Sequence, residues 1–438
     1  MAPGVIARGF SIFRSSAIEA NAMSKVATRI VGFDEALEMV LAHASDLAVP
    51  ATEVIALPAC DGRVLAQAVL ADRDHPPFDR STRDGFAVHA SEFGIGTLRI
   101  AGQVRAGEQW EHGVLEPGAA IEIMTGAPVP EGADAVLMVE HVKRNGATIQ
   151  RLSERTIRIG ENIVRRGSEA RVGEAVLPAG TLICAAEIAL AAACGASVLT
   201  VFRRPRVAIV ATGDELVEID AIPGPQQIRN SNSYGLAALV EEAGGEAVRL
   251  PIARDNRPEL EETIRSVRRC DLVLLSGGVS MGAYDLVEEV LQRLDGEFFF
   301  NGVRMQPGKP VVFGRLPAAD GFPAQFFFGL PGNPVSTQVT FHCFAEPLLR
   351  AMGGAEVHGP RFAQATLAED AVGKPDLMQI LPARLTANRV RPDVRLVSWQ
   401  GSGDLAANAR ANCYAVLPPA KERFLAGDRI TILLRSRL

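Results

Sequence analysis

Three loops rich in glycine and proline follow predicted strands within residues 271–336 of this 438-residue sequence. They read Ser276-Gly277-Gly278-Val279-Ser280, Gln306-Pro307-Gly308-Lys309-Pro310 and Pro331-Gly332-Asn333-Pro334-Val335-Ser336. Glycine lets backbone amides approach an anion closely, and a lysine such as Lys309 adds a point charge. Each loop alone is also what an ordinary tight turn requires. Three in succession, each at the end of a strand, favour a binding site for an anionic ligand.

Five acidic residues stand beside a glycine, a turn or the end of a predicted strand: Asp84, Glu169, Glu215, Asp255 and Asp285. A hard cation such as Mg2+ prefers carboxylate and water oxygens. Glu215 and Asp285 follow strands of one predicted sheet, so they can face one cleft and hold a metal ion there. Each acid alone could equally be a helix cap or part of a solvated turn. Together with the anion-binding loops, they indicate metal-assisted chemistry on a phosphate-bearing ligand.

The elements that must position these groups belong to an alternating pattern of strands and helices. Residues 272–275 form a continuous apolar run, which is typical of a parallel strand buried on both faces. Strands at 207–210 and 247–252 precede it, and a helix capped by Asn232 or Ser233 lies between them. The pattern predicts a doubly wound α/β domain, in which ligands bind at the carboxyl ends of the strands.

The rest of the chain divides around this domain. An amphipathic helix at 33–44 is expected to pack on an alanine-rich helix near 185–194, although the two lie far apart in the sequence. Short strands with glycine turns predict a β domain inserted between them, and the C-terminal part predicts a small β barrel or sandwich without a convincing helix. The predicted divisions are a disordered tail at 1–28, a discontinuous N-terminal domain at 29–70 and 167–203, the inserted β domain at 71–166, the α/β domain at 204–353 and the C-terminal β domain at 354–438.

The composition excludes several classes of function. The net charge of −6 gives the protein no overall electrostatic attraction to nucleic acid or to an anionic membrane surface. The six cysteines show no CxxC spacing, which is typical of a reducing cytoplasm and argues against a thiolate zinc site. Residues 181–202 carry a single charge, Glu187, and imitate a membrane span. Because Gly195 interrupts this segment, a buried helix followed by a strand is predicted instead.

The motifs, taken in order along the chain, resemble those of the molybdopterin molybdenumtransferase family, which includes the carboxyl-terminal part of gephyrin. The resemblance covers about residues 29–438. The segments that carry it are 77–88, 124–130, 212–216, 276–280, 307–310, 330–336 and 400–402.

This resemblance implies an enzyme that hydrolyses adenylylated molybdopterin and inserts molybdate at the dithiolene, with Mg2+. It implies a cytoplasmic homodimer with a cleft between the α/β domain of one subunit and the β domain of the other. Contacts with a molybdopterin adenylyltransferase and with recipient molybdoenzymes follow from that role. The implied catalytic residues are Asp84, Glu215 and Asp285, of which Glu215 and Asp285 also hold the metal. The implied substrate-binding residues are Thr125, Glu169, Asp255, Ser276, Gly277, Gly278, Ser280, Gln306, Lys309, Pro331, Pro334, Ser336 and Ser402.

The sequence departs from the family at three positions. Aspartate is common where Glu169 stands, lysine is common at Gln306, and a family arginine falls at Pro382. The last two changes remove cations from the implied oxyanion pocket of Lys309, Ser336 and Ser402.

Two alternatives stay open from the sequence. A molybdopterin adenylyltransferase resembles residues 206–352, but its loop reads Gly-Gly-Thr-Gly and it lacks the flanking β domains. A non-catalytic scaffold of the gephyrin kind is the other alternative, and the retained acids and Lys309 argue against it.

Overall fold

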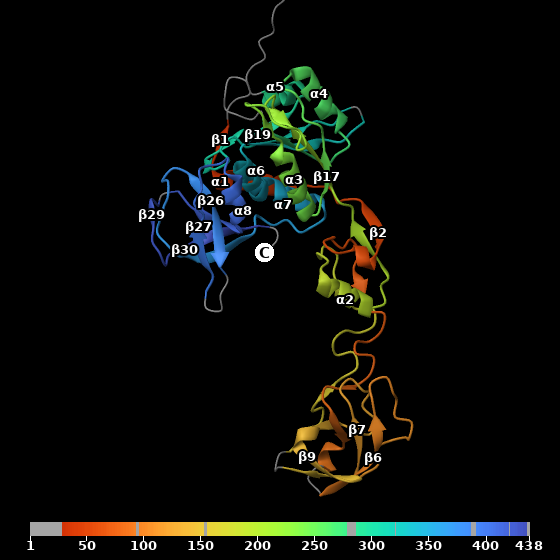
Figure 1. Cartoon of the computed structure of the whole chain (residues 1–438). Coiled ribbons are helices and arrows are strands. Elements are labelled where there is room, and N and C mark those ends of the chain that lie inside the picture. Colours follow the sequence, from red (N-terminus) through yellow and green to blue (C-terminus); the bar gives the residue numbers. More distant parts are fainter. Residues whose placement is uncertain are drawn as a thin grey trace, which may run out of the picture.

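The computed structural model describes residues 29–92, 96–152, 156–277, 286–319, 321–386, 391–419 and 421–435. The predicted tail at 1–28 lies outside these residues. The described chain is elongated: the inserted β domain lies at one end, and the α/β domain lies beside the C-terminal barrel at the other (Figure 1). Among the helices that the structure describes, none combines the length and the apolar character needed to cross a bilayer.

The α/β domain is built on a six-stranded sheet with the order β17-β14-β18-β23-β22-β19. The first four strands run parallel to one another, and β22 runs antiparallel to β23. Residues 272–275 are fully buried in the central strand β18, as predicted, and each such side chain contributes about 1.5–3 kcal/mol. The strands are β14 (Arg206–Ala211), β17 (Glu246–Arg249), β18 (Leu272–Ser276), β19 (Glu297–Phe300), β22 (Val312–Leu316) and β23 (Gln325–Leu330).

Helices cover both faces of this sheet. In β14, Val207 and Ile209 point into one apolar cluster, and Ala208 and Val210 point into another on the opposite face. This confirms the doubly wound fold. The helices are α3 (Ser231–Glu242), α4 (Arg257–Ser266), α5 (Leu286–Arg293), α6 (Pro334–Thr340) and α7 (Glu346–Met352), with a π-helical turn at Phe341–Ala345 between α6 and α7.

The first helix, α1 (Phe33–Ser45), completes the core of the α/β domain. Its apolar face packs on α7 and on the π-helical turn, where the rings of Phe33 and Phe344 lie 5.6 Å apart. The expected pairing with the alanine-rich helix α2 (Ala185–Ala193) is therefore wrong. In α2 only Ala191 is buried, so the prediction of a buried helix is wrong as well. Phenylalanine and valine on α1 offer far more apolar area than the alanines of α2, so α1 gains more by joining the larger core.

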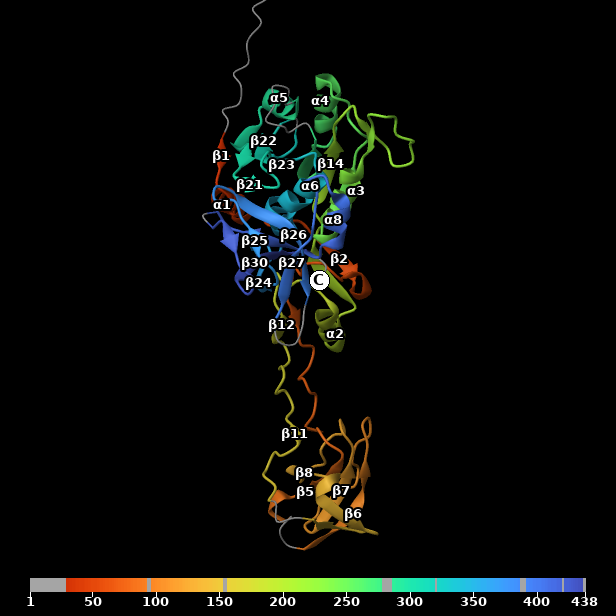
Figure 2. The same cartoon turned by 60° about the vertical axis from the view of Figure 1, so that its left-hand side comes forward.

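A smaller cluster forms where two distant segments meet. Strand β2 (Thr52–Ala56) pairs with β13 (Val198–Phe202), and α2 packs on the same cluster. From here two segments run side by side towards the inserted domain, as Figure 2 shows. Their paired strands are β3 (Val69–Leu70) with β12 (Ala175–Leu177) and β4 (Arg80–Ser81) with β11 (Ile163–Val164).

The inserted domain is a six-stranded sheet with the order β8-β5-β7-β6-β10-β9, in agreement with the predicted β structure. Strand β5, which lies between β8 and β7, begins at Gly85, where a Cβ atom would lie 1.7 Å from the carbonyl oxygen of Leu137. Only glycine fits there, so the preceding loop has a fixed position. The strands are β5 (Gly85–Val88), β6 (Thr97–Val104), β7 (Ala119–Ile123), β8 (Ala135–Met138), β9 (Val142–Asn145) and β10 (Thr148–Arg151).

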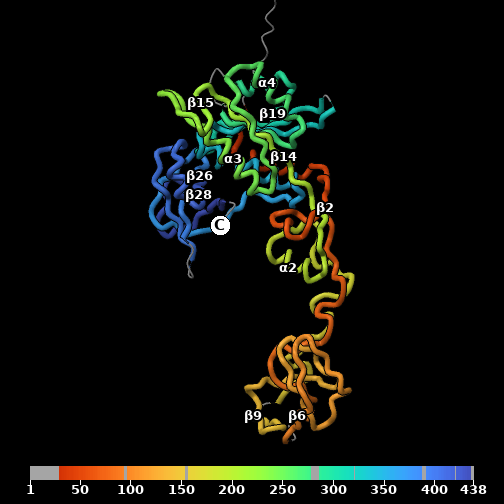
Figure 3. The backbone as a smooth tube through the Cα atoms, turned by 45° about the vertical axis from the view of Figure 1, so that its right-hand side comes forward, coloured from red at the N-terminus to blue at the C-terminus, as the bar shows by residue number. Residues whose placement is uncertain are grey.

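The C-terminal domain is a closed five-stranded barrel, because β26 pairs with both β27 and β28. It lies against the α/β domain (Figure 3). The short strand β21 (Met305–Gln306) of that domain pairs in parallel with β26. The barrel does contain a helix, α8 (Leu405–Arg410), which the sequence did not predict; Asp404 caps its first turn. The strands are β24 (Phe362–Leu367), β26 (Met378–Thr386), β27 (Asp393–Leu396), β28 (Cys413–Leu417) and β30 (Arg429–Leu434).

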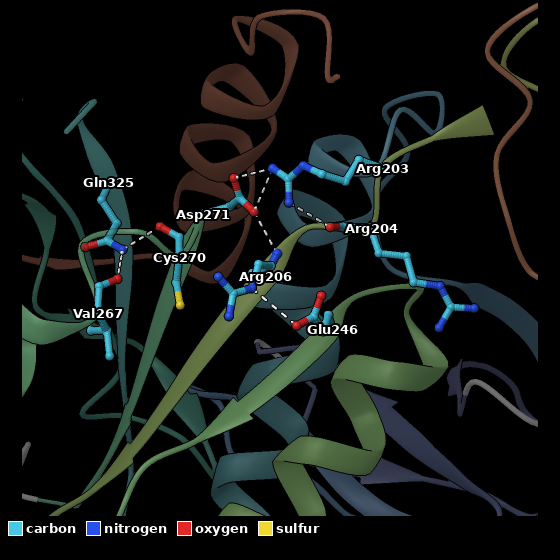
Figure 4. A network of polar contacts seen from close by, with 8 residues as sticks. All are labelled: Arg203, Arg204, Arg206, Glu246, Val267, Cys270, Asp271 and Gln325. Atoms are coloured by element: carbon cyan, nitrogen blue, oxygen red, sulfur yellow. Dashed lines mark hydrogen bonds and ion pairs between the residues drawn. The ribbon is translucent and has the colours of Figure 1, made fainter. Parts of the chain in front are cut away.

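The strands β14, β18 and β23 begin at the same edge of the α/β sheet, which we call the entry edge. Polar side chains there form hydrogen bonds and ion pairs with one another and with the backbone (Figure 4). The Asp271 carboxylate accepts two hydrogen bonds from Arg203, at 2.9 and 3.1 Å, and one from the backbone N–H of Arg206 at 2.6 Å. Hydrogen bonding to Asp271 raises the pKa of Arg203. The buried Gln325 amide donates to the carbonyls of Val267 and Cys270.

Candidate functional site

The opposite edge of the sheet, where β14, β18 and β23 end, gathers the predicted site residues of the α/β domain. We call it the exit edge. The hydroxyl of the buried Thr212, after β14, donates to Asp255 Oδ1 at 2.6 Å. Asp255 follows β17, and its backbone N–H and that of Asp214 contact each other's carboxylates at 3.3 and 3.4 Å. The loops after two neighbouring strands are thus joined, as the parallel topology predicts.

The loops after β14, β18 and β23 contact one another through backbone atoms. Gly277 has φ +96°, and a Cβ atom there would lie 2.4 Å from the carbonyl oxygen of Thr212. A Cβ atom at Gly332 would lie 3.6 Å from the Cα atom of Gly277. Side chains are excluded from this junction, so an anion can approach the backbone closely. The N–H groups of Thr212 and Gly277 donate to the carbonyl oxygens of Ser276 and Leu330, at 3.1 and 3.4 Å.

Asn232, in the first turn of α3, ties two of these loops together. Its Nδ2 atom donates to Ser276 Oγ at 2.9 Å and to the carbonyl oxygen of Gly332 at 2.7 Å. From the sequence, this residue was predicted only as a candidate helix cap. The cap is Asn230, whose Oδ1 atom accepts a hydrogen bond from the N–H of Ser233. No local pattern identifies Asn232, because its two acceptors lie 44 and 100 residues further along the chain.

Glu215 lies on the same edge, with its carboxylate beside Gly213. A Cβ atom at Gly213, where φ is +152°, would lie 2.5 Å from Glu215 Oε2. The acids here are all oxygen donors, the type that Mg2+ prefers. Among the described residues, no three His, Cys, Asp or Glu side chains come together as a metal site. The predicted residues Gly278, Ser280 and Asp285 lie outside the described residues.

The second predicted loop reaches the exit edge from the opposite direction. Gln306 ends β21, and Lys309 follows with an exposed side chain. Strand β22 then begins at Val312, which pairs with Gly329 near the end of β23. Because β22 is antiparallel to β23, its start lies at the edge where β23 ends. Lys309 is thereby brought to the side of the sheet that carries Gly332.

The third loop lies against the C-terminal barrel. Pro331 is buried, and its carbonyl oxygen accepts a hydrogen bond from Thr337 in α6. Pro334 opens α6, and Ser336 is buried in its first turn. The N–H of Val335 donates to the carbonyl oxygen of Ser402 at 3.0 Å. The barrel loop that carries Ser402 therefore lies at the start of α6, as the implied oxyanion pocket requires.

A second group of predicted residues lies on the inserted domain and its connection. Asp84 Oδ1 accepts hydrogen bonds from the backbone N–H of Thr125 at 2.7 Å and from its hydroxyl at 2.8 Å. These bonds lower the pKa of Asp84. Glu169 pairs with Arg80 at 2.8 Å. Asp84 directly precedes β5, so within one chain this group lies far from the exit edge (Figure 2).

A cavity of about 340 Å³ lies elsewhere, at the seam between α3, the π-helical turn and the barrel. None of its lining residues was predicted as a site residue, so it is separate from the groups described above. They are Gly235, Ala238, Leu239, Glu242, Gln338, His342, Ala411, Asn412 and Arg435.

Comparison with known proteins identifies the family of this chain. Three family models match the sequence: the MoeA N-terminal region (domain I and II) over residues 31–195, the probable molybdopterin binding domain over residues 208–351, and the MoeA C-terminal region (domain IV) over residues 364–434. The sequence is 36% identical over 392 residues to a molybdopterin molybdenumtransferase of Nostoc sp., covering 87% of this chain and 88% of that one. The chain belongs to the molybdopterin molybdenumtransferase family.

Other members support this assignment. A molybdopterin molybdenumtransferase of Haemophilus influenzae is 34% identical over 391 residues, covering 87% of this chain and 93% of that one. The crystal structure of a molybdopterin biosynthesis MoeA protein from Pyrococcus horikoshii OT3 aligns with a TM-score of 0.75 at 29% identity, over 93% of this chain and all of that one (100%). Membership of the molybdopterin molybdenumtransferase family confirms the predicted family, fold class and enzyme class. The matches also extend over the β domains, which an adenylyltransferase would lack.

Proposed function

We propose that this enzyme of molybdenum cofactor biosynthesis hydrolyses adenylylated molybdopterin and inserts molybdate into the dithiolene, with AMP as the other product. The observation that carries the proposal is the exit edge. Three loops meet there through glycine backbone, beside the Thr212–Asp255 pair and Glu215. Such an edge suits a ligand that carries phosphate groups.

Each part of the site has a distinct proposed role. The backbone N–H of Gly332 binds phosphate oxygens, while that of Gly277 donates to the carbonyl oxygen of Leu330 at 3.4 Å and holds the loop. Lys309, Ser336 and Ser402 receive the molybdate oxyanion. Glu215, with Asp285, would hold Mg2+, which when bound would neutralise charge on the phosphate oxygens.

Hydrolysis consumes one water molecule. Its oxygen bonds to phosphorus, the bridging P–O bond breaks, and a proton must leave the water. We assign that proton to the Asp84 carboxylate. The hydrogen bonds from Thr125 lower the pKa of Asp84, so this carboxylate stays ionised, and able to accept a proton, to a lower pH than an ordinary aspartate.

The distance between the two groups of residues supports a homodimer. Asp84 directly precedes β5 in the inserted domain, and Glu215 directly precedes β15 in the α/β domain. These two domains lie at opposite ends of the elongated subunit (Figures 2 and 3), so a second copy would have to bring its inserted domain to the exit edge. The proposed dimer therefore has two sites, each shared between subunits.

Subunit mixing tests this arrangement. Asp84→Ala and Glu215→Ala homodimers should each be inactive, and random exchange between them should restore about a quarter of wild-type activity, because half of the dimers then have one intact site. Each variant subjected alone to the same exchange is the control. No recovery after verified exchange would contradict the shared site.

The activity itself is tested by AMP release from adenylylated molybdopterin, measured with and without molybdate. Failure to release AMP from correctly folded protein would favour the scaffold alternative. We also propose a cytoplasmic location and transient contacts with the adenylyltransferase that supplies the substrate and with the molybdoenzymes that receive the cofactor.

A further inference from the structure

Asn232 forms hydrogen bonds that α3 does not need for its own stability. Capping of the helix falls to Asn230, which is 2% exposed. The Asn232 side chain instead extends across the exit edge to Ser276 Oγ, at the end of β18, and to the carbonyl oxygen of Gly332, after β23. Both acceptors belong to loops that we assign to substrate binding.

The direction of these hydrogen bonds follows from the chemistry of the partners. A backbone carbonyl such as that of Gly332 can only accept, so the Asn232 atom facing it must be the NH2 group. The same NH2 group lies 2.9 Å from Ser276 Oγ, which therefore also accepts. The hydroxyl hydrogen of Ser276 must then point away from Asn232, and among the described residues it has no acceptor.

We propose that Asn232 is a positioning residue that commits the Ser276 hydroxyl to donate a hydrogen bond to a phosphate oxygen of the substrate. This inference rests on the proposed function, because it concerns the same site. A serine hydroxyl can normally donate or accept, and it rotates to suit its neighbours. Here one lone pair is occupied by a donor from α3, so the hydrogen can be donated to an anion that reaches the inner end of the site, where Ser276 is 2% exposed. Hydrogen bonds to charged acceptors are about twice as strong as neutral ones.

The proposal predicts an order among substitutions at Asn232. Asn232→Ala removes the two hydrogen bonds that link the loops, but it leaves the Ser276 hydroxyl free to donate to the substrate. In Asn232→Asp the isosteric carboxylate has no hydrogen, so the Ser276 hydroxyl would turn towards it and away from the substrate. The Asp variant should therefore bind substrate more weakly than the Ala variant. The carboxylate would also face the Gly332 carbonyl oxygen without a hydrogen, so the role of the Ser276 hydroxyl must be isolated by combining the changes.

A double-mutant cycle provides the decisive test. KM and kcat for AMP release, and the melting temperature, are measured for wild type, Asn232→Asp, Ser276→Ala and the double variant. We expect Asn232→Asp to raise KM by about tenfold to a hundredfold, since hydrogen bonds to charged groups contribute at this level. In the Ser276→Ala background the same change should add less than twofold, because the hydroxyl that it misdirects is already gone.

The controls separate the possible failures. Asn333→Asp adds the same negative charge beside Gly332, at an exposed side chain that forms no capping hydrogen bond, and should raise KM less than Asn232→Asp does. If wild type releases AMP but Asn232→Asp keeps the wild-type KM, or if the two single changes are additive, the inference about Asn232 is overturned while the proposed function stands. If wild type itself releases no AMP, it is the proposed function that fails.

Discussion

The entry and exit edges of the α/β sheet are made from the same strands, yet they use their polar groups in opposite ways. At the entry edge, Arg203 and the backbone of Arg206 occupy the Asp271 carboxylate, and Gln325 satisfies two buried carbonyls. At the exit edge, glycines bring backbone into contact, and the Ser276 hydroxyl donates to no residue that the structure describes. Groups satisfied within the chain stabilise the fold, and groups left available can bind a ligand.

The largest effect is expected at the exit edge, from Gly277→Ala. The added Cβ atom would meet the Thr212 carbonyl oxygen at 2.4 Å, so the loops after β14 and β18 must separate. We expect kcat/KM to fall more than a hundredfold, a loss of about 3 kcal/mol of transition-state stabilisation. Gly180→Ala is the matched control, because Gly180 has a similar φ of +88° but an added Cβ atom there would have no neighbour within 4 Å. Equal activity in the two variants would mean that the close contact between the loops after β14 and β18 is not needed for activity.

At the entry edge, Gln325→Met should have the reverse profile. Methionine has a similar length, but it leaves the carbonyls of Val267 and Cys270 without their donor in a buried position. We expect a loss of about 3 kcal/mol in the free energy of unfolding, measured by urea denaturation, with kcat/KM unchanged. A variant that kept its stability but lost activity would mean that the two edges are not functionally distinct.

An intermediate effect is expected from Gln306→Lys, which restores a cation common in the family. Gln306 is half-buried, and its Oε1 atom accepts only a long 3.4 Å hydrogen bond from Gln379, so the substitution disturbs little. Lysine should lower the molybdate concentration for half-maximal activity by roughly tenfold, equivalent to about 1.4 kcal/mol. The control is Gln364→Lys, on the exposed side of the barrel. If both variants behave like wild type, residue 306 does not face the oxyanion.

The smallest effect is expected from Asp271→Asn at the entry edge. The amide oxygen can still accept the hydrogen bond from Arg206, but the charge that pairs with Arg203 is lost. Both side chains are partly exposed, so we expect a loss of only about 1 kcal/mol in the free energy of unfolding. Turnover should not change, and raised salt should weaken the wild type towards the variant.

The two edges also show which features a sequence can reveal. The exit loops were predictable because glycines that follow apolar strands can be read directly from the sequence. In a parallel sheet, the loops that follow the strands meet at one edge, where ligands bind. The partner of α1 was not predictable, since its amphipathic pattern fixes which face is buried but not which core it joins. Asn232 was missed because its role depends on two acceptors brought near by the fold. Helix α8 was missed because it is short and lies among strands.

The paired segments that lead to the inserted domain have a consequence for how this chain can be remodelled. Leu70 and Ala175 stand opposite each other in neighbouring strands, so the chain leaves and returns at points about 5 Å apart. Residues 71–174 can therefore be removed together, because a two-residue Asn-Gly turn would join Leu70 to Ala175. A chain shortened in this way would keep the exit edge and the barrel but lose Asp84. It would be a molecule that captures its ligand and holds it without converting it.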